Sequence, residues 1–418
     1  MLVGRLLGFG SLSVLGSASA LLVLPLLSRS AGQEGWVAFG TGQAIGTLAA
    51  AVVMLGWNLV GQAEVAVAAP AGRPAVLARS LRVRLPLVLA CSPLAGVLAA
   101  ALVPGSHALA ATTAAATTTT GLAVGWYCIG EGSARRLLVF EAGPKLVAAL
   151  ASAVALALGA SPQVYPVTLT AVQLIAVARL AHTVLRGTGE PVVASPRRWW
   201  SEVALAWQGS ASVLLGTVAA TLPVPLATAF AGAAGGAGAA GFVSADRLYR
   251  YALLVVVGLG NALAAWCAGS PRRVEVGRRL HLLLGLVGGA ALATLGPAVS
   301  GLLFGEHVRA DPVVLAWQSL AFLALGVSTP LVRMVFGFAD HWRPVLASTV
   351  ASAGLGTLAM VGGGLLTGAT GVAAGLAAGE VVGAGTLLAL RHRPSPAGRP
   401  PLPTAPPART VPSEVERR

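Results

Sequence analysis

Long apolar runs separated by short polar segments cover most of the chain. A run of about 20 apolar residues is long enough for a helix to cross the hydrocarbon layer of a membrane. The pattern predicts twelve spanning helices, at residues 6–28, 36–58, 83–103, 107–128, 138–159, 164–185, 203–228, 240–267, 280–304, 313–336, 344–364 and 369–390. The expected fold class is therefore all-α, a polytopic membrane protein.

The polar segments divide these spans into two groups. A charged, proline-containing stretch at 187–202 is expected to link an N-terminal six-helix lobe (1–186) to a C-terminal six-helix lobe (203–390). The tail at 391–418 is rich in Pro and Arg and is expected to be disordered in the cytoplasm. The stretch at 60–82 carries one Glu and several Arg residues, and we expect it to lie as a helix on the membrane surface.

A short repeat suggests that the two lobes are related. AGQEGWVAF at 31–39 matches AGAAGFVSA at 237–245 with a constant offset of 206 residues. Each copy leads into a long helix, and many transporters build a central site between such paired halves. The repeat favours two pseudo-symmetric lobes, although chance similarity between small-residue membrane sequences stays open as an alternative.

Composition agrees with a membrane protein. Hydrophobic residues make up 56% of the 418 residues, charged residues 10%, and the mean hydropathy is +0.80, which excludes a water-soluble domain. The three cysteines, Cys91, Cys128 and Cys267, lie in apolar runs without paired CxxC or histidine spacing. We therefore expect no disulfide framework, no metal site and no cofactor.

The net charge of +14 is explained by topology. Most Lys and Arg residues fall on one face of the twelve-span arrangement, whereas only Arg29 and Arg309 fall on the other. The positive-inside rule then predicts cytoplasmic termini in a plasma or inner membrane. The basic residues are expected to contact anionic membrane lipids, and no nucleic-acid partner is expected.

The most informative stretch is the eighth span, which places charge inside an apolar run. Asp246, Arg247 and Arg250 lie too deep to reach water easily, so they are expected to face protein or a wet cavity. Asp246 and Arg250 are four residues apart and share a helix face, and Asn261 returns close to the same azimuth. These four residues are predicted to line a passage.

Five further polar residues are weaker candidates for the same cavity. Arg179 and Arg333 lie near the predicted cytoplasmic ends of their spans, so snorkelling to the headgroups is an equal alternative to cavity lining. Gln43 and Asn58 give the second span a sparse polar face, for which ordinary hydrogen bonding between helices is as good an explanation. Glu380, near the middle of the last span, is a candidate for proton coupling or for holding an arginine, and the alternative is a protonated packing residue.

Three segments carry a resemblance to a known family. They are LLVLPLLSRSAGQEGWVAF at 21–39, AGAAGFVSADRLYRYALL at 237–254, and LGPAVSGLLFGEHVRADPVVLAWQSLAFLALG at 295–326. In order and spacing they resemble the polysaccharide-flippase branch of the multidrug, oligosaccharidyl-lipid and polysaccharide (MOP) exporter superfamily, the O-antigen-type flippases. The resemblance covers roughly residues 1–390. One departure is the seventh span, which has no acidic residue where many family members carry one, so any shared ion-coupling site there is in doubt.

The resemblance implies a function and partners. Flippases of this branch move a polyprenyl-pyrophosphate-linked oligosaccharide from the inner to the outer leaflet by alternating access, for cell-surface polysaccharide synthesis. The expected partners are this glycan lipid, membrane lipids, and a glycan polymerase with glycosyltransferases. The deep arginines would bind the pyrophosphate anion. A multidrug or small-molecule exporter of the same superfamily is an open alternative.

An enzyme is the alternative from another class. A membrane glycan polymerase or glycosyltransferase needs catalytic groups on sizeable outward loops, but the predicted outward segments, such as 29–35, are short. No HxxE, GxSxG or metal-binding spacing appears, so we expect no enzymatic activity. No nucleotide-binding loop appears either, and a gradient of protons, sodium or the substrate would have to drive transport.

Overall fold

The structure, a computed structural model, describes residues 19–58, 60–189, 196–230, 237–267, 270–336 and 342–391. Across these ranges the secondary structure is helical and contains no strand. Eight helices within them are long and apolar enough to cross a membrane. The expected all-α, polytopic class is confirmed. The first predicted span lies mostly outside the described ranges, and the count of twelve stays a prediction.

The first group of helices, which we call the N-terminal bundle, packs around the long helix α2. Its elements are η1 (Ser19–Leu22), α2 (Leu24–Met54), α3 (Val60–Val67), η2 (Pro70–Gly72), α4 (Arg73–Leu102), α5 (His107–Thr119), η3 (Thr120–Leu122), α6 (Gly125–Gly130), α7 (Ala134–Leu137), η4 (Leu138–Ala142), α8 (Gly143–Ala157) and α9 (Val164–Leu185).

The second group, the C-terminal bundle, follows α10 (Pro196–Thr221). Its elements are α11 (Pro223–Ala229), α12 (Ala237–Cys267), α13 (Pro271–Phe304), η6 (Glu306–Val308), α14 (Pro312–Pro330), η7 (Leu331–Phe336), α15 (Trp342–Thr367) and α16 (Ala369–Leu390).

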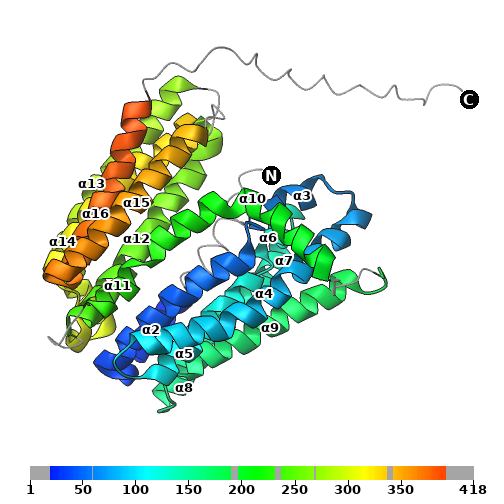
Figure 1. Ribbon diagram of the computed structural model, residues 1–418, viewed down its shortest axis with the longest axis horizontal. Helices are drawn as coiled ribbons and strands as arrows, with labels where there is room; N and C mark the ends of the chain where they lie inside the picture. Colours follow the sequence, from blue (N-terminus) through cyan, green and yellow to red (C-terminus); the bar gives the residue numbers. More distant parts are fainter. Residues whose placement is uncertain are drawn as a thin grey trace, which may run out of the picture.

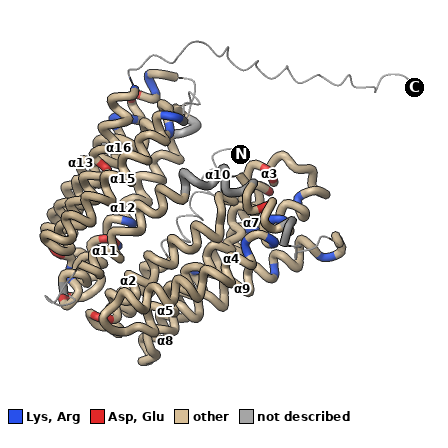
Figure 2. Tube along the Cα trace, in the orientation of Figure 1, with Lys and Arg blue, Asp and Glu red and all other residues tan. Residues whose placement is uncertain are grey.

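The two bundles touch at one end and diverge toward the other (Figure 1). At the touching end, Ser28 Oγ donates a hydrogen bond to Phe304 O at 2.8 Å, and His307 Nε2 lies 3.1 Å from Ser28 O. The charged ends of α13 and α16 lie at the diverging end (Figure 2). The largest cluster of buried apolar side chains joins residues of α2, α12 and α14 where the bundles meet.

Several predicted boundaries agree closely with the structure and others do not. Helices α9 and α16 lie at 164–185 and 369–390 as predicted. The expected loop at 29–35 is instead helical, within α2, with a sharp break at Gly32, whose φ of +65° is one that glycine adopts without strain. The surface helix expected at 60–82 is wrong beyond Val67, because α4 already begins at Arg73, with a proline in its first turn.

The predicted span at 107–128 is broken. Helix α5 ends at Thr119, and Ala123 leaves the helical conformation before α6 begins. The carbonyl groups freed by this break accept hydrogen bonds from one guanidinium group: Arg84 Nη1 donates to Gly121 O and to Ala123 O, both at 2.9 Å. The side chain of Arg84 is fully buried and lies over the Trp126 ring.

Replacing Arg84 with Met should destabilise the N-terminal bundle. A buried carbonyl left without a donor costs about 1–3 kcal/mol, and the Gly121 carbonyl is buried while that of Ala123 is partly buried. The effect is measured as the melting temperature in detergent, which is obtained from the fraction of protein that stays monodisperse after heating. Arg135→Met is the matched control, because Arg135 lies nearby on α7 with an exposed side chain. Equal melting temperatures for the two variants would contradict this role of Arg84.

Helix α10 begins inside the predicted linker and attaches to the N-terminal bundle. Trp199 Nε1 donates to Val83 O at 3.3 Å, and Glu202 forms an ion pair with Arg82, also at 3.3 Å, in which both side chains are largely buried. Farther along, α10 packs against α2 and against α15 of the other bundle. The chain then bends at Leu222, before Pro223 opens α11. The predicted lobe boundaries are not tested by this arrangement and stay a prediction.

Candidate functional site

Helices α2 and α12, which carry the two copies of the sequence repeat, face each other where the bundles meet. Trp36 Nε1 donates to Ser244 Oγ at 3.0 Å, and Ser244 Oγ donates to Val308 O at 2.6 Å. At Gly40 the helices approach so closely that a β-carbon would lie 2.6 Å from a methyl group of Val243. Glycine at this position therefore sets the distance between the two bundles.

A charged cluster lies on α12 directly beside this contact. Arg250 Nε donates to Asp246 Oδ2 at 2.5 Å, and Arg250 Nη2 donates to Ala220 O of α10 at 2.7 Å. The predicted pairing of Asp246 with Arg250 on one helix face is present. The guanidinium of Arg247 instead lies 5.2 Å from the centre of the Phe39 ring, on α2.

A small pocket of about 70 Å³ opens beside this cluster. Its wall on α12 consists of Asp246, Arg247 and Arg250, and its wall on α2 consists of Gly40, Gln43, Ala44 and Thr47. Two buried atoms around it, Arg247 Nε and Gln43 Oε1, have no hydrogen-bond partner among the described residues. The pocket thus has one donor and one acceptor available to a bound molecule, one on each bundle.

The formal charge of the pocket is positive. Asp246 is the one carboxylate among the described lining residues and forms its ion pair with Arg250, so two cations share one anion and Arg247, with 8% of its surface exposed, has no ion pair of its own. A buried charge without a partner is costly. Such a site favours a ligand that brings a negative charge, because the ligand would supply the missing partner.

A second polar contact lies farther along α12. Arg333 Nη1, on the π-helical turn η7, donates to Asn261 Oδ1 at 2.5 Å, and its side chain lies against Gly260. Both residues were predicted as cavity candidates, but their contact with each other was not. They join α12 to the end of α14 within the C-terminal bundle, and neither lines the pocket beside Arg247.

Three other predicted residues lie apart from the pocket. Asn58 is exposed in the turn that follows α2, and Arg179 is exposed on α9. Glu380 is half-buried on α16, in electrostatic range of Tyr249 on α12. Gln43 is the one candidate from the first half of the chain that the fold brings to the charged cluster.

Sequence reasoning missed the aromatic part of the site. Trp36 and Phe39 were treated only as part of the repeat, yet their rings lie 5.9 Å apart and continue to Phe304 and Tyr165. The available signal was their position: Trp36 aligns with Phe242 and Phe39 with Ala245 in the repeat, so they face the second copy.

The fold thus consists of two helical bundles that meet at one end. The charged pocket lies between α2 of the first bundle and α12 of the second. No protein-family model matches the chain, and no curated protein matches it. Solved structures do share its fold. An inward-facing multidrug resistance MATE family transporter of the MOP superfamily aligns with 90% of this chain and 93% of its own, at 15% identity and a TM-score of 0.66.

Two further structures extend the comparison. An outward-facing MATE family transporter aligns with 93% of this chain and 94% of its own, at 16% identity and a TM-score of 0.54. A MOP superfamily transporter from Pyrococcus furiosus, described as having a binding pocket of reverse polarity that suggests a different function, covers the same shares at 16% identity and a TM-score of 0.62. The chain therefore has the fold of MATE transporters of the MOP superfamily.

Proposed function

We propose that this protein is a membrane transporter that works by alternating access and carries a polyprenyl-pyrophosphate-linked oligosaccharide from the inner to the outer leaflet. The observation that carries the proposal is Arg247 in the pocket between α2 and α12, a buried cation without an ion pair of its own whose Nε has no hydrogen-bond partner among the described residues. A pyrophosphate cannot cross hydrocarbon unaided, and a guanidinium group binds it through charge-assisted hydrogen bonds.

The fold supports the transport mechanism. In the described helices the bundles are in contact at the end that carries Arg29 and Arg309, and they diverge at the arginine-rich end. By the positive-inside rule the diverging end faces the cytoplasm, so this conformation would accept a substrate from the inner leaflet. Opening would require breaking the contacts of Ser28 with Phe304 and His307, and of Trp36 with Ser244.

The alternative is a multidrug exporter, which the fold accommodates equally well. Two of the compared structures are described as multidrug resistance transporters. The aromatic rings of Trp36, Phe39 and Tyr165 could contact a flat, apolar drug. The charge balance argues against a cationic drug, because Asp246 is already paired with Arg250 and Arg247 would repel a like charge.

One reconstitution experiment separates the two. Purified protein is placed in liposomes that contain a fluorescent polyprenyl-pyrophosphate lipid, and a membrane-impermeant reductant bleaches the probe in the outer leaflet. Transport should make the inner-leaflet probe accessible as well. The parallel assay measures accumulation of ethidium. If the liposomes accumulate ethidium while the lipid probe in the inner leaflet stays unbleached, the flippase is refuted and the exporter is supported.

Glu380 is proposed as the residue that couples transport to an ion gradient. Its carboxyl group lies on α16, half-buried, and no hydrogen bond reaches it from the described residues. An acidic group in that setting can exchange a proton or bind a cation. We expect Glu380→Gln to lower gradient-driven transport at least about tenfold while downhill exchange of the probe continues.

The matched control for Glu380 is Glu306→Gln. Glu306 is an exposed carboxylate paired with Arg309 at the other end of the C-terminal bundle. Liposomes with an imposed proton or sodium gradient give the rates for both variants. Gradient-driven transport that survives in Glu380→Gln at the wild-type rate would rule out this coupling role.

A further inference from the structure

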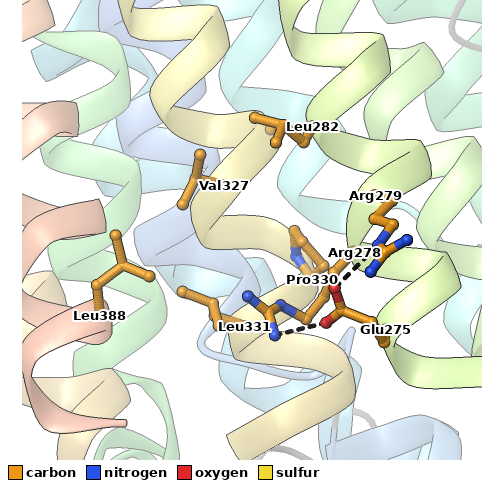
Figure 3. Close-up of a pocket in the computed structure, with 9 residues that line it drawn as sticks. Glu275, Arg278, Arg279, Leu282, Val327, Pro330, Leu331 and Leu388 are labelled. Atoms are coloured by element: carbon orange, nitrogen blue, oxygen red, sulfur yellow. Dashed lines mark hydrogen bonds and ion pairs between the residues drawn. The ribbon is translucent and has the colours of Figure 1, made fainter. Parts of the chain in front are cut away.

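A groove at the arginine-rich end of the C-terminal bundle lies outside the site between the bundles. It has a volume of about 100 Å³ and is enclosed by α13, α14, η7 and α16. Figure 3 shows Glu275, Arg278 and Arg279 at one end of it, and Leu282, Val327 and Leu388 around the rest. A groove of this size holds several water molecules or a small polar group.

The charged end of the groove is basic. Glu275 accepts from Arg278 Nη1 at 2.9 Å and from Arg279 Nε at 3.1 Å. Arg391, at the end of α16, lies within electrostatic range of the same carboxylate. Three cations therefore surround one anion, and the side chain of Arg279 is 78% exposed. This surplus of positive charge complements a phosphate group.

The opposite end of the groove is apolar and continues onto an apolar surface. Leu282 and Leu388 line the groove while remaining 42% and 40% exposed, and Leu283 and Leu286 continue the exposed stripe along α13. In a membrane protein such a surface meets lipid tails. The groove thus changes from basic to apolar along a single helix.

The position of the groove along α13 fits the membrane boundary. Helix α13 has 34 residues, so it is about 51 Å long at 1.5 Å per residue, well beyond a hydrocarbon layer of about 30 Å. Its first turns, which carry Glu275, Arg278 and Arg279, can therefore stand at headgroup level. Leu282 and the leucines after it then lie at the depth of the acyl chains.

Close helix packing forms the floor of the groove. A β-carbon on Gly326 would lie 2.9 Å from His281 O and 3.0 Å from Gly285 Cα, so α13 and α14 can touch only because glycine is present. Beyond Pro330 the chain widens into the π-helical turn η7, a local geometry that is frequent at functional sites. The floor is thus built from small residues beside a widened turn.

We infer that this groove binds an anionic phospholipid of the cytoplasmic leaflet, with its phosphate on Arg278 and Arg279 and an acyl chain along Leu282 and Leu388. Leu331 of the groove and Arg333, which bonds to Asn261 of α12, belong to the same turn η7. A lipid bound against Leu331 would therefore stabilise η7, the turn whose Arg333 is hydrogen-bonded to α12. The inference is independent of which molecule is transported.

Native mass spectrometry of the purified protein with phosphatidylglycerol tests the inference. We expect wild-type protein to retain this lipid, and Arg278→Gln/Arg279→Gln to retain about tenfold less, since each cation near an anionic surface contributes to binding. Leu388→Trp, which fills the apolar end without changing charge, should lower retention as well. The control Arg135→Gln/Arg186→Gln removes two exposed cations of the N-terminal bundle, away from the groove.

Three results would overturn the site. The first is equal retention of phosphatidylglycerol by the wild type and by Arg278→Gln/Arg279→Gln. The second is a loss of retention in the control variant as large as that in Arg278→Gln/Arg279→Gln. Retention of zwitterionic phosphatidylethanolamine at the same level would show that charge is not recognised. A further arm uses inorganic phosphate: if it displaces phosphatidylglycerol completely, the groove is a free-anion site and the lipid assignment fails.

Discussion

Replacing Arg247 with Gln should lower transport of the polyprenyl-pyrophosphate probe by about 10- to 100-fold. A charge-assisted hydrogen bond to an anion is worth about 1.5–3 kcal/mol, and each 1.4 kcal/mol changes an equilibrium about tenfold. The effect should exceed that of most cavity substitutions, because Arg247 is the cation of the pocket without a carboxylate of its own. The liposome assay measures the rate at fixed probe concentration.

Two further variants make the Arg247 result specific. Arg247→Lys keeps the charge but loses the planar guanidinium over Phe39, so an intermediate rate is expected. Arg186→Gln removes an exposed cation at the end of α9 and should leave transport unchanged. Monodisperse elution of each variant establishes that it has folded. A wild-type rate in Arg247→Gln would remove the basis for an anionic substrate.

Locking the two bundles together should abolish transport reversibly. A β-carbon on Gly40 would lie 3.3 Å from the β-carbon of Val243, a few tenths of an ångström below the usual disulfide range of about 3.5–4.5 Å. Replacing Val243 also removes the methyl groups that would otherwise collide with a new side chain at position 40. The double variant Gly40→Cys/Val243→Cys should therefore form a disulfide between α2 and α12.

The cross-linking experiment starts from a variant without Cys91, Cys128 and Cys267, so that only the new pair can react. Oxidation should reduce transport to the level of empty liposomes, and a reductant should restore it. Val243→Cys alone, treated in the same way, is the control. Full transport by the oxidised, cross-linked protein would mean that α2 and α12 need not separate, and alternating access would be refuted.

The fold was largely predictable because membrane-spanning helices follow from apolar length. The ends of α9, α14 with η7, and α16 agree with the predicted spans, since few polar residues interrupt these runs. The failures occurred where tertiary contacts compensate for a local break. The end of α5 is stabilised by Arg84 from another helix, and no pattern within 107–128 reveals that donor.

The site was predictable in part for a similar reason. Charge at membrane depth pointed to Asp246, Arg247 and Arg250, and their spacing gave the ion pair within one helix. Spacing could not show that Gln43 lies across from them while Asn58 does not, because this depends on how two helices distant in sequence approach each other. The close approach of α2 to α12 at Gly40 places Gln43 beside the charged cluster.

The hydrogen bond from Arg250 to Ala220 O has a mechanical consequence. Ala220 lies just before the bend between α10 and α11, while the beginning of α10 is anchored to α4 through Trp199 and Glu202. The bend is followed by Pro223, which has no amide hydrogen and so cannot continue the hydrogen bonds of α10. Arg250, which lines the same pocket as Arg247, is thereby bonded to the residue just before this bend, so the pocket and the connection between α10 and α11 are joined through one side chain.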